Sequence, residues 1–406
     1  MPLTNKRAIA AALLGVGLVA TACGSSSSGG TPSSGSTPSS GSSSSASVPD
    51  VSATSFTTDF SQMAALKSVA ANGKGSIGVL LPDTVTSARY VEFDAPLLTK
   101  AFTTAGLTSA QFTVKNAHGD NATQFGQAQA DITNGASVLI VDPFSTGVGA
   151  RIEKYGQQHG VAVIDYDRLT LGGARTYYIS FNNVAVGKLI GNGFAACVKA
   201  WHVSSPKFIE MKGDPTDNNA TLFAQGYNSV IKAHGSAWTK VAEPPGTWDP
   251  PTALREFTQA LTANPSANSA IIPNDENAAP IISYLKNHGH KAKTFPITGQ
   301  DATLVGLQNI LNGYQCGTAY KPIYLEAQAA AAVALYVRDK QTPPADLVNG
   351  TTEDTQENKA VPSVLLTPEW VTPANMASTV VKDGAVPAKQ ICTSAYAKEC
   401  KAAGIS

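Results

Sequence analysis

The chain has 406 residues, of which 43% are hydrophobic, so it is long enough to bury the cores of two domains of ordinary size. It carries 29 basic and 29 acidic residues with no basic block or stripe, which argues against a nucleic-acid partner. Charged residues make up only 14% of the chain, so uncharged polar residues must cover much of its surface.

The first residues indicate export. Lys6 and Arg7 form a short basic region, followed by an uncharged apolar run that is shorter than the roughly 20 residues needed to span a bilayer. This pattern predicts a signal peptide over residues 1–22. The small residues before Cys23 resemble a bacterial lipobox, which implies cleavage before Cys23 and acylation of its thiol. Ordinary signal cleavage near Ala22, with Cys23 unmodified, is the alternative.

A low-complexity segment follows. Residues 24–45 contain only Gly, Ser, Thr and Pro, a composition that cannot bury enough apolar surface to offset its ordering entropy. We therefore expect residues 23–50 to be an acylated cysteine with a disordered tether, which would span about 25 Å on average. The expected location is the outer face of the cell membrane, with the folded body held by a lipid anchor.

From Ser76 onward, short β-rich apolar runs alternate with amphipathic stretches of helix length. The runs that predict strands are Ile77–Leu81, Phe112–Lys115, Val138–Asp142, Ala162–Tyr166, Thr176–Phe181, Phe208–Met211, Lys240–Ala242, Ala270–Ile272, Phe295–Thr298 and Thr318–Tyr320. The predicted helices include Thr123–Asn134, Val184–Ala200, Pro251–Ala263 and Ala278–His288. This alternation predicts an α/β fold with parallel sheets and helices on both faces. Ten strands in two groups of five favour two similar lobes.

Polar residues cluster directly after these strands. They are Asp83, Arg89-Tyr90, Asp142 and Asp167-Arg168 in the first half, and Asp214, Asp217-Asn218-Asn219, Asn274-Asp275, Gln300-Asp301 and Lys321 in the second. In open parallel sheets, ligands bind beyond the carboxyl ends of the strands. If the two lobes face each other, these groups converge on one cleft. Taken singly, each Asp is better explained as a helix N-cap.

This set of side chains suits a polyhydroxylated ligand. A sugar hydroxyl both donates and accepts hydrogen bonds, so carboxylates can take its proton while Arg, Lys or Asn donate to its lone pairs. The apolar faces of a sugar ring pack against aromatic side chains such as Tyr90 and Trp248. For Trp248, packing in the core is an equally good alternative.

Motifs of common enzymes and metal sites are missing from the sequence. It has no G-x-S-x-G elbow, no H-E-x-x-H and no Walker A loop. His288 and His290 are expected in an exposed turn, and none of the cysteine spacings is a C-x-x-C pair. We therefore expect a protein that is not an enzyme and that needs no cofactor and no metal.

Four cysteines follow Cys23, an even number that suggests two disulfides in an exported protein. Three connectivities are open. We favour Cys392–Cys400 with Cys197–Cys316, because the first pair closes a short loop near the end of the chain.

Several segments resemble the type I periplasmic sugar-binding proteins, and among them the xylose-binding branch that serves bacterial ABC transporters. These segments are VAVIDYDRL (161–169), YYISFNNVAVGKL (177–189), GDPTDNNATLFAQG (213–226), PNDENA (273–278), TGQDATLVGLQ (298–308), AYKPI (319–323) and SVLLTPEW (363–370). The likeness runs in order from about Ser76 to Val386, and the tail from Pro387 lies outside it.

The resemblance implies a role for ten residues. Asp167, Arg168 and Arg89 would hold the sugar from the first lobe with Tyr90 stacking on its ring, while Asp217, Asn219, Asn274, Asp301 and Lys321 would complete the hydrogen bonds and Trp248 would stack on the opposite face. It also implies a three-strand hinge near residues 179–183, 320–323 and 365–369. The lobes would comprise residues 75–180 plus 323–365 and residues 181–322 plus 366–406.

The implied function is capture of a monosaccharide and its delivery to an ABC permease by a monomeric protein. A sensor that presents the sugar to a chemoreceptor or kinase is the alternative. Two positions depart from the family pattern: Tyr90 stands where the family has tryptophan, and the loop at residues 83–88 lacks the family's charged residues. D-xylose is therefore the first expected ligand, with glucose or galactose as alternatives.

Overall fold

A computed structural model describes residues 51–405 of the chain. The predicted signal peptide, Cys23 and the tether lie outside the described residues. Residues 48–406 cluster into one compact unit. Among residues 51–405, every helix is too short or too polar to cross a membrane.

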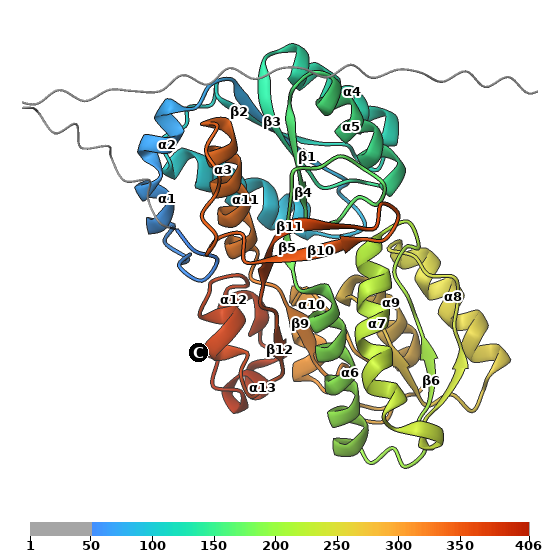
Figure 1. The fold of residues 1–406 in the computed structure, drawn as a ribbon. Coiled ribbons are helices and arrows are strands. Elements are labelled where there is room, and N and C mark those ends of the chain that lie inside the picture. The colour runs from blue at the N-terminus through green and yellow to red at the C-terminus, as the bar shows by residue number, and fades with distance from the viewer. Residues whose placement is uncertain (1–50, 406) are drawn as a thin grey trace, which may run out of the picture. The chain divides into compact units, whose positions relative to one another are not determined.

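The larger sheet has seven strands (Figure 1). In spatial order they are β10 (Gly350–Asp354), β11 (Lys359–Leu366), β5 (Tyr177–Phe181), β4 (Ala162–Tyr166), β3 (Ala136–Val141), β1 (Ser76–Leu81) and β2 (Phe112–Asn116). All neighbours are parallel except β10 and β11, which form an antiparallel pair. The five strands that the sequence predicts in this half are confirmed.

Helices cover both faces of this sheet. Helices α4 (Asn121–Thr133) and α5 (Thr146–Gln158) pack on one face, and α3 (Ala95–Thr104) and α11 (Ile323–Arg338) pack on the other. Helix α11 is apolar on almost all sides and is buried along most of its length, as expected for a helix inside a core. The three layers, with the sheet between two layers of helices, therefore follow from the alternation of strands and helices in the sequence.

Two short helices precede the first strand, α1 (Ser61–Ala65) and α2 (Lys67–Asn72). Buried side chains at helical spacing join them to the core beneath α3 and α11: Phe56, Phe60, Met63, Leu66 and Val69. No element was predicted for these residues, although their apolar spacing is a recognisable helical signal.

The second half of the chain forms a narrower sheet of three parallel strands in the order β7 (Thr239–Ala242), β6 (Lys207–Glu210) and β8 (Ser269–Ile271). Helices α6 (Asn183–Ala200) and α7 (Asn218–Lys232) pack together, as do α8 (Pro250–Ala263) and α9 (Asp275–Asn287). The strand predicted at Phe295–Thr298 is absent: Ile297 makes a single bridge to Ala270. The two groups of five predicted strands therefore differ from the sheets of the structure, which have seven, three and two strands.

A separate two-stranded ribbon pairs β9 (Thr318–Tyr320) with β12 (Glu369–Val371). Around it pack α10 (Leu304–Leu311), a π-helical turn (Ala377–Val381) and two short helices, α12 (Ala388–Ile391) and α13 (Ala397–Ala402). The remaining short elements are a π-helical turn at Tyr90–Asp94 and a 3₁₀ turn at Gly235–Ala237.

The chain crosses three times between its two halves, which we call the first and second lobes. The crossings run from β5 to α6, from β9 to α11 and from β11 to β12. On the side of the first lobe, each crossing starts or ends at an element of the seven-stranded sheet or at α11, which packs on that sheet. On the side of the second lobe it starts or ends at α6, β9 or β12, which contact one another. Such short paired connections let two lobes rotate about one hinge.

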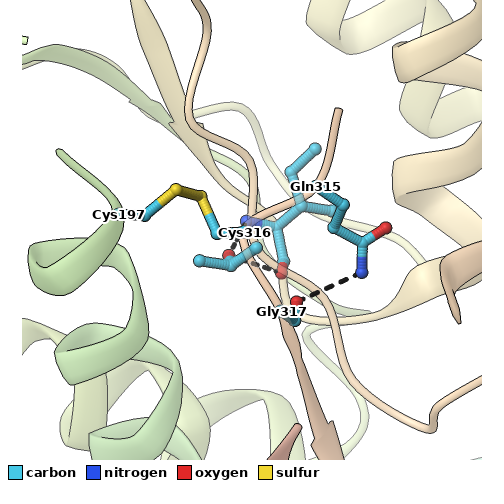
Figure 2. The surroundings of a disulfide bond; sticks show 6 residues. Cys197, Gln315, Cys316 and Gly317 are labelled. Atoms are coloured by element: carbon cyan, nitrogen blue, oxygen red, sulfur yellow. Dashed lines mark hydrogen bonds between the residues drawn. A yellow bond between two sulfur atoms is a disulfide. The ribbon is translucent and has the colours of Figure 1, made fainter. Parts of the chain in front are cut away.

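Both disulfides of the favoured pairing are present. Cys197 near the end of α6 is bonded to Cys316, just before β9, and Cys392 is bonded to Cys400 between α12 and α13. Figure 2 shows the bond between Cys197 and Cys316. Beside it, Gln315 Nε2 donates a hydrogen bond to the carbonyl oxygen of Gly317 at 3.2 Å. The first bond thus ties the end of helix α6 to the segment that leads into strand β9.

Candidate functional site

One cavity between the lobes collects all ten residues that the resemblance assigned to the sugar. Its lining also includes Thr86, Ser87, Phe223 and Gln300. The free volume among these side chains is about 30 Å³, so they almost fill the cleft between the lobes.

The loop after β4 supplies the centre of the first-lobe wall. Asp167 has a φ of 57°, a left-handed conformation that Asp tolerates better than most residues. Its carbonyl oxygen accepts hydrogen bonds from Tyr178 Oη (2.8 Å), Ser180 Oγ (2.9 Å) and Asn219 Nδ2 (2.9 Å). Because Asn219 belongs to the second lobe, this strained turn is held in place from both sides of the cleft.

Arg89 is almost fully occupied by carboxylates. It contacts Asp94 through Nε (2.9 Å) and Nη2 (2.8 Å), Glu326 through Nη2 (2.7 Å) and Asp167 through Nη1 (2.9 Å). This uses four of its five N–H groups, so it can offer a ligand no more than one. We therefore expect Arg89 to act mainly by fixing the Asp167 carboxylate.

Asp167 remains ionised despite its burial. Burial alone would raise its pKa, but Arg89 and then Lys321 and Arg168 hold the pKa below its usual value. The Lys321 ammonium lies 3.7 Å from Asp167 Oδ1 and 3.1 Å from Asp301 Oδ1. A charged acceptor beside a charged donor is thus available to neighbouring hydroxyl groups of a ligand.

Arg168 reaches across the cleft. Its Nη2 donates to the Tyr90 hydroxyl at 2.8 Å, and its Nε lies 3.3 Å from Oδ2 of Asp217 in the second lobe. The guanidinium groups of Arg89 and Arg168 both lie 5.7 Å from the centre of the Tyr90 ring. Tyr90 therefore lines the cavity and also positions a cation there.

Asp217 and Trp248 form the facing wall. Asp217 caps helix α7 by accepting from Asn219 N (2.9 Å), and its other oxygen accepts from Trp248 Nε1 (2.9 Å). The Trp248 side chain is 8% exposed and packs edge-on to Phe223. Asp217 is thus an N-cap and Trp248 is packed, and both side chains also line the cavity.

The later strand ends complete the second-lobe wall. Asn274 caps α9 through Asn277 N (3.2 Å), and its Nδ2 donates to Glu276 at 3.3 Å. Among the described residues, Gln300 Oε1 is buried without a hydrogen-bond donor, whereas Asp301 Oδ1 lies 3.1 Å from the Lys321 ammonium. A buried acceptor such as Gln300 Oε1 is costly unless a partner reaches it, so it suits a ligand with hydroxyl groups.

Other polar strand-end residues serve turns instead of the cavity. Asp83 accepts from Val85 N and Thr86 N, both at 2.7 Å, and Asp214 accepts from Thr216 N at 2.8 Å. For Asp83 and Asp214 the turn chemistry explains the residue type, as it does in most loops.

The charges in the cavity balance. Three cations (Arg89, Arg168 and Lys321) face three carboxylates (Asp167, Asp217 and Asp301). An anion or a cation would therefore meet opposing charges of both signs, whereas a neutral polyol can use every donor and acceptor. In residues 51–405, no group of His, Cys, Asp and Glu side chains is arranged to hold a metal ion.

Sequence reasoning missed four lining residues. Gln300 follows a predicted strand and was noted there but not assigned to the site, whereas Thr86 and Ser87 lie in a loop whose fold the sequence did not predict. Phe223 lies on α7, facing Lys321 at 5.9 Å from the ring centre. An apolar residue within a helix carries no signal that separates cavity lining from core.

Comparison with known proteins gives consistent results. A family profile described as a periplasmic binding protein domain matches residues 77–342. The D-xylose-binding periplasmic protein of Escherichia coli (strain K12) is 36% identical over 287 residues, which cover 68% of this chain and 81% of that protein. The multiple sugar-binding periplasmic receptor ChvE of Rhizobium radiobacter is 29% identical over 338 residues, covering 78% and 92%.

A solved structure shares the fold. The ABC transporter solute-binding protein of Clostridium phytofermentans, solved with β-D-glucose, superposes with a TM-score of 0.69 at 24% identity and covers 78% of this chain and 99% of its own. The profile match spans more than half of this chain, and the Escherichia coli relative exceeds 30% identity. The chain therefore belongs to the type I periplasmic sugar-binding proteins and is similar to their D-xylose-binding members.

Proposed function

We propose that this chain captures a single aldose in the cavity between its lobes and delivers it to the permease of an ABC importer. D-xylose is the first choice and D-glucose the second. The observation that carries the proposal is the convergence of ten polar and aromatic residues from both lobes on one small, charge-balanced cavity. A relative named for D-xylose supports the choice of sugar.

Domain closure is the mechanism that the contacts support. The two lobes meet through an ion pair between Arg168 and Asp217, a hydrogen bond from Asn219 Nδ2 to the backbone carbonyl of Asp167, and a hydrogen bond from Ser87 to Glu276. A ligand that touches both lobes in the closed form alone shifts the hinge equilibrium towards that form. Enclosure also makes each polar match stringent, because an unmatched buried group costs about 1–3 kcal/mol.

Calorimetric titration of xylose, glucose, galactose, arabinose and ribose tests the proposal. We expect at least one aldose to bind with a Kd below about 100 μM, a binding free energy near −5.5 kcal/mol. If none of these sugars binds that tightly, capture of a monosaccharide is not the function of this chain.

We further propose that the mature chain is anchored to the membrane by acylation of Cys23, as its lipobox-like context suggests. In the native host, Cys23→Ala should leave the membrane fraction and become soluble. Retention of that variant in the membrane at the wild-type level would contradict the anchor.

A further inference from the structure

The Arg168 side chain lies between two carboxylates that belong to opposite lobes. Its Nε is 3.7 Å from Asp142 Oδ1 and 3.3 Å from Asp217 Oδ2. Its other contacts are donations from Nη2 to the Tyr90 hydroxyl (2.8 Å) and from Nη1 to the carbonyl oxygen of Pro143 (3.4 Å). Because Nε carries a single hydrogen, it can satisfy only one of the two carboxylates at a time.

Asp142 has no other partner for its charge. It directly follows β3, is fully buried, and neither of its carboxylate oxygens has a hydrogen-bond donor among the described residues. Burial raises the pKa of this carboxyl well above its ordinary value, and Arg168 is the charge that most opposes the rise. Asp217, by contrast, has donors in Asn219 N and Trp248 Nε1 whether or not Arg168 is near.

We propose that Asp142 is the partner of Arg168 in the open form and that closure transfers Arg168 from Asp142 to Asp217. This inference rests on the proposed function, because it assigns a part of the closure step. Asp142 and Arg168 both belong to the first lobe, after β3 and β4, so they stay together when the second lobe carries Asp217 away. Asp142 does not line the cavity, so it is a positioning residue that acts through Arg168.

Through this exchange, Asp142 stabilises the open form relative to the closed form. In the closed form it is left buried without a donor, so part of the free energy of sugar binding must offset its loss of Arg168. Removing its charge should weaken the open form more than the closed form. The closed fraction of the ligand-free protein should then rise, and the apparent Kd should fall in proportion.

The matched pair Asp142→Asn and Asp217→Asn tests this directly. We expect Asp142→Asn to lower the Kd for the bound aldose by about threefold or more and to make the ligand-free protein more compact in small-angle scattering. Asp217→Asn should raise the Kd, because it removes the partner that favours closure. A purely structural Asp142 would change the melting temperature without tightening binding. A folded Asp142→Asn variant with unchanged or weaker binding overturns the proposal.

A second measurement needs no variant. In a crystal structure of the ligand-free wild-type protein with the lobes apart, Arg168 should donate to Asp142 at about 2.7–2.9 Å. An Arg168 side chain that points away from Asp142 in that structure overturns the proposal, even if Asp142→Asn does not fold. If the wild-type protein binds no sugar, the proposed function fails, and the open structure still decides whether Asp142 holds Arg168.

Discussion

At the scale of single residues, Trp248 combines a packed ring with a hydrogen bond to a carboxylate of the cavity. Its ring lies against Gly213, where a Cβ atom would approach Trp248 Cζ2 to 2.1 Å, so glycine is needed for this packing. Its indole N–H also fixes the Asp217 carboxylate at 2.9 Å. Trp248 therefore positions a cavity carboxylate while its own body is largely buried.

Two substitutions separate these roles. Trp248→Phe keeps a ring in place but loses the hydrogen bond, so we expect the sugar Kd to rise about tenfold with a small loss of stability. Trp248→Ala also removes the buried ring, so it should cost about 3–5 kcal/mol in the free energy of unfolding and weaken binding further. Calorimetry and urea unfolding measure the two effects. Normal binding by folded Trp248→Ala would exclude a role for the ring in the site.

The residue types at the strand ends predicted which residues line the cavity more reliably than they predicted what each residue contacts there. The positions of Asp167, Asp217 and Lys321 follow from the rule that ligands bind beyond parallel strands. The same rule included Asp83 and Asp214, which stabilise turns. Sequence could not show that Arg89 is occupied by Asp94 and Glu326, because Glu326 lies 237 residues away in the chain and the π-helical turn that ends at Asp94 was not predicted.

At the scale of elements, the disulfides differ in what they constrain. Cys197–Cys316 closes a loop with a sequence separation of 119, whereas the separation of Cys392 and Cys400 is 8. In the chain-entropy account, a longer loop restricts the unfolded chain more strongly. The long-range disulfide should therefore contribute more to stability.

Paired Cys→Ser variants test this order. Replacing Cys197 and Cys316 should lower the free energy of unfolding by about 5 kcal/mol, and replacing Cys392 and Cys400 by about 2.5 kcal/mol. Urea unfolding of both double variants beside the wild type measures the difference. An equal or larger loss from the short-loop pair would contradict the entropic explanation.

Short β-branched runs between helical patterns identified β1 to β5 correctly, because the central strands are buried and largely apolar and the edge strand β2 keeps Phe112 and Val114. The same signal failed at residues 295–298, where one bridge replaces a strand. The pair β10 and β11 was missed because β10 lies at the sheet edge with alternating exposed polar residues, and β11 contains Pro362. Strand β10 lacks the apolar run on which the prediction depended.

At the scale of the whole molecule, we expect closure to be coupled to the uptake of a proton by Glu276. Glu276 of the second lobe accepts from Ser87 Oγ (3.2 Å) and Ala88 N (3.4 Å) of the first. Burial, then the Asp301 and Asp275 carboxylates, raise the pKa of Glu276 to about 8 from an ordinary value of 4.5. Opening would expose this carboxyl and lower its pKa, so closure takes up a proton between these two values.

The sign of the pH dependence follows. A carboxyl whose pKa is raised in the closed form favours closure when protonated, and this contribution is lost as the pH rises towards about 8. We expect the sugar affinity to fall between about pH 5 and about pH 8, by at most tenfold per pH unit from this group, and to level off above about pH 8. Calorimetry across this range measures the slope.

Glu276→Gln provides the control, because a glutamine cannot titrate and can still accept from Ser87 and Ala88. It should flatten the pH dependence. Asp275, whose pKa is about 7, accepts from Thr303, Gln315 and Thr318 within its own lobe, so its titration should be common to both forms. A slope unchanged in Glu276→Gln would show that another group couples closure to pH.

Capture of an aldose in the interlobe cavity is tested most directly by calorimetric titration of D-xylose into the wild type, Asp167→Asn and Asp120→Asn. Asp120 is an exposed helix cap outside the cavity, and asparagine caps equally well. We expect a wild-type Kd below about 100 μM, the same Kd for Asp120→Asn, and a Kd at least about tenfold higher for Asp167→Asn. Failure of the wild type to bind any of the five aldoses, or undiminished binding by Asp167→Asn, would contradict the assignment of this cavity as the sugar site.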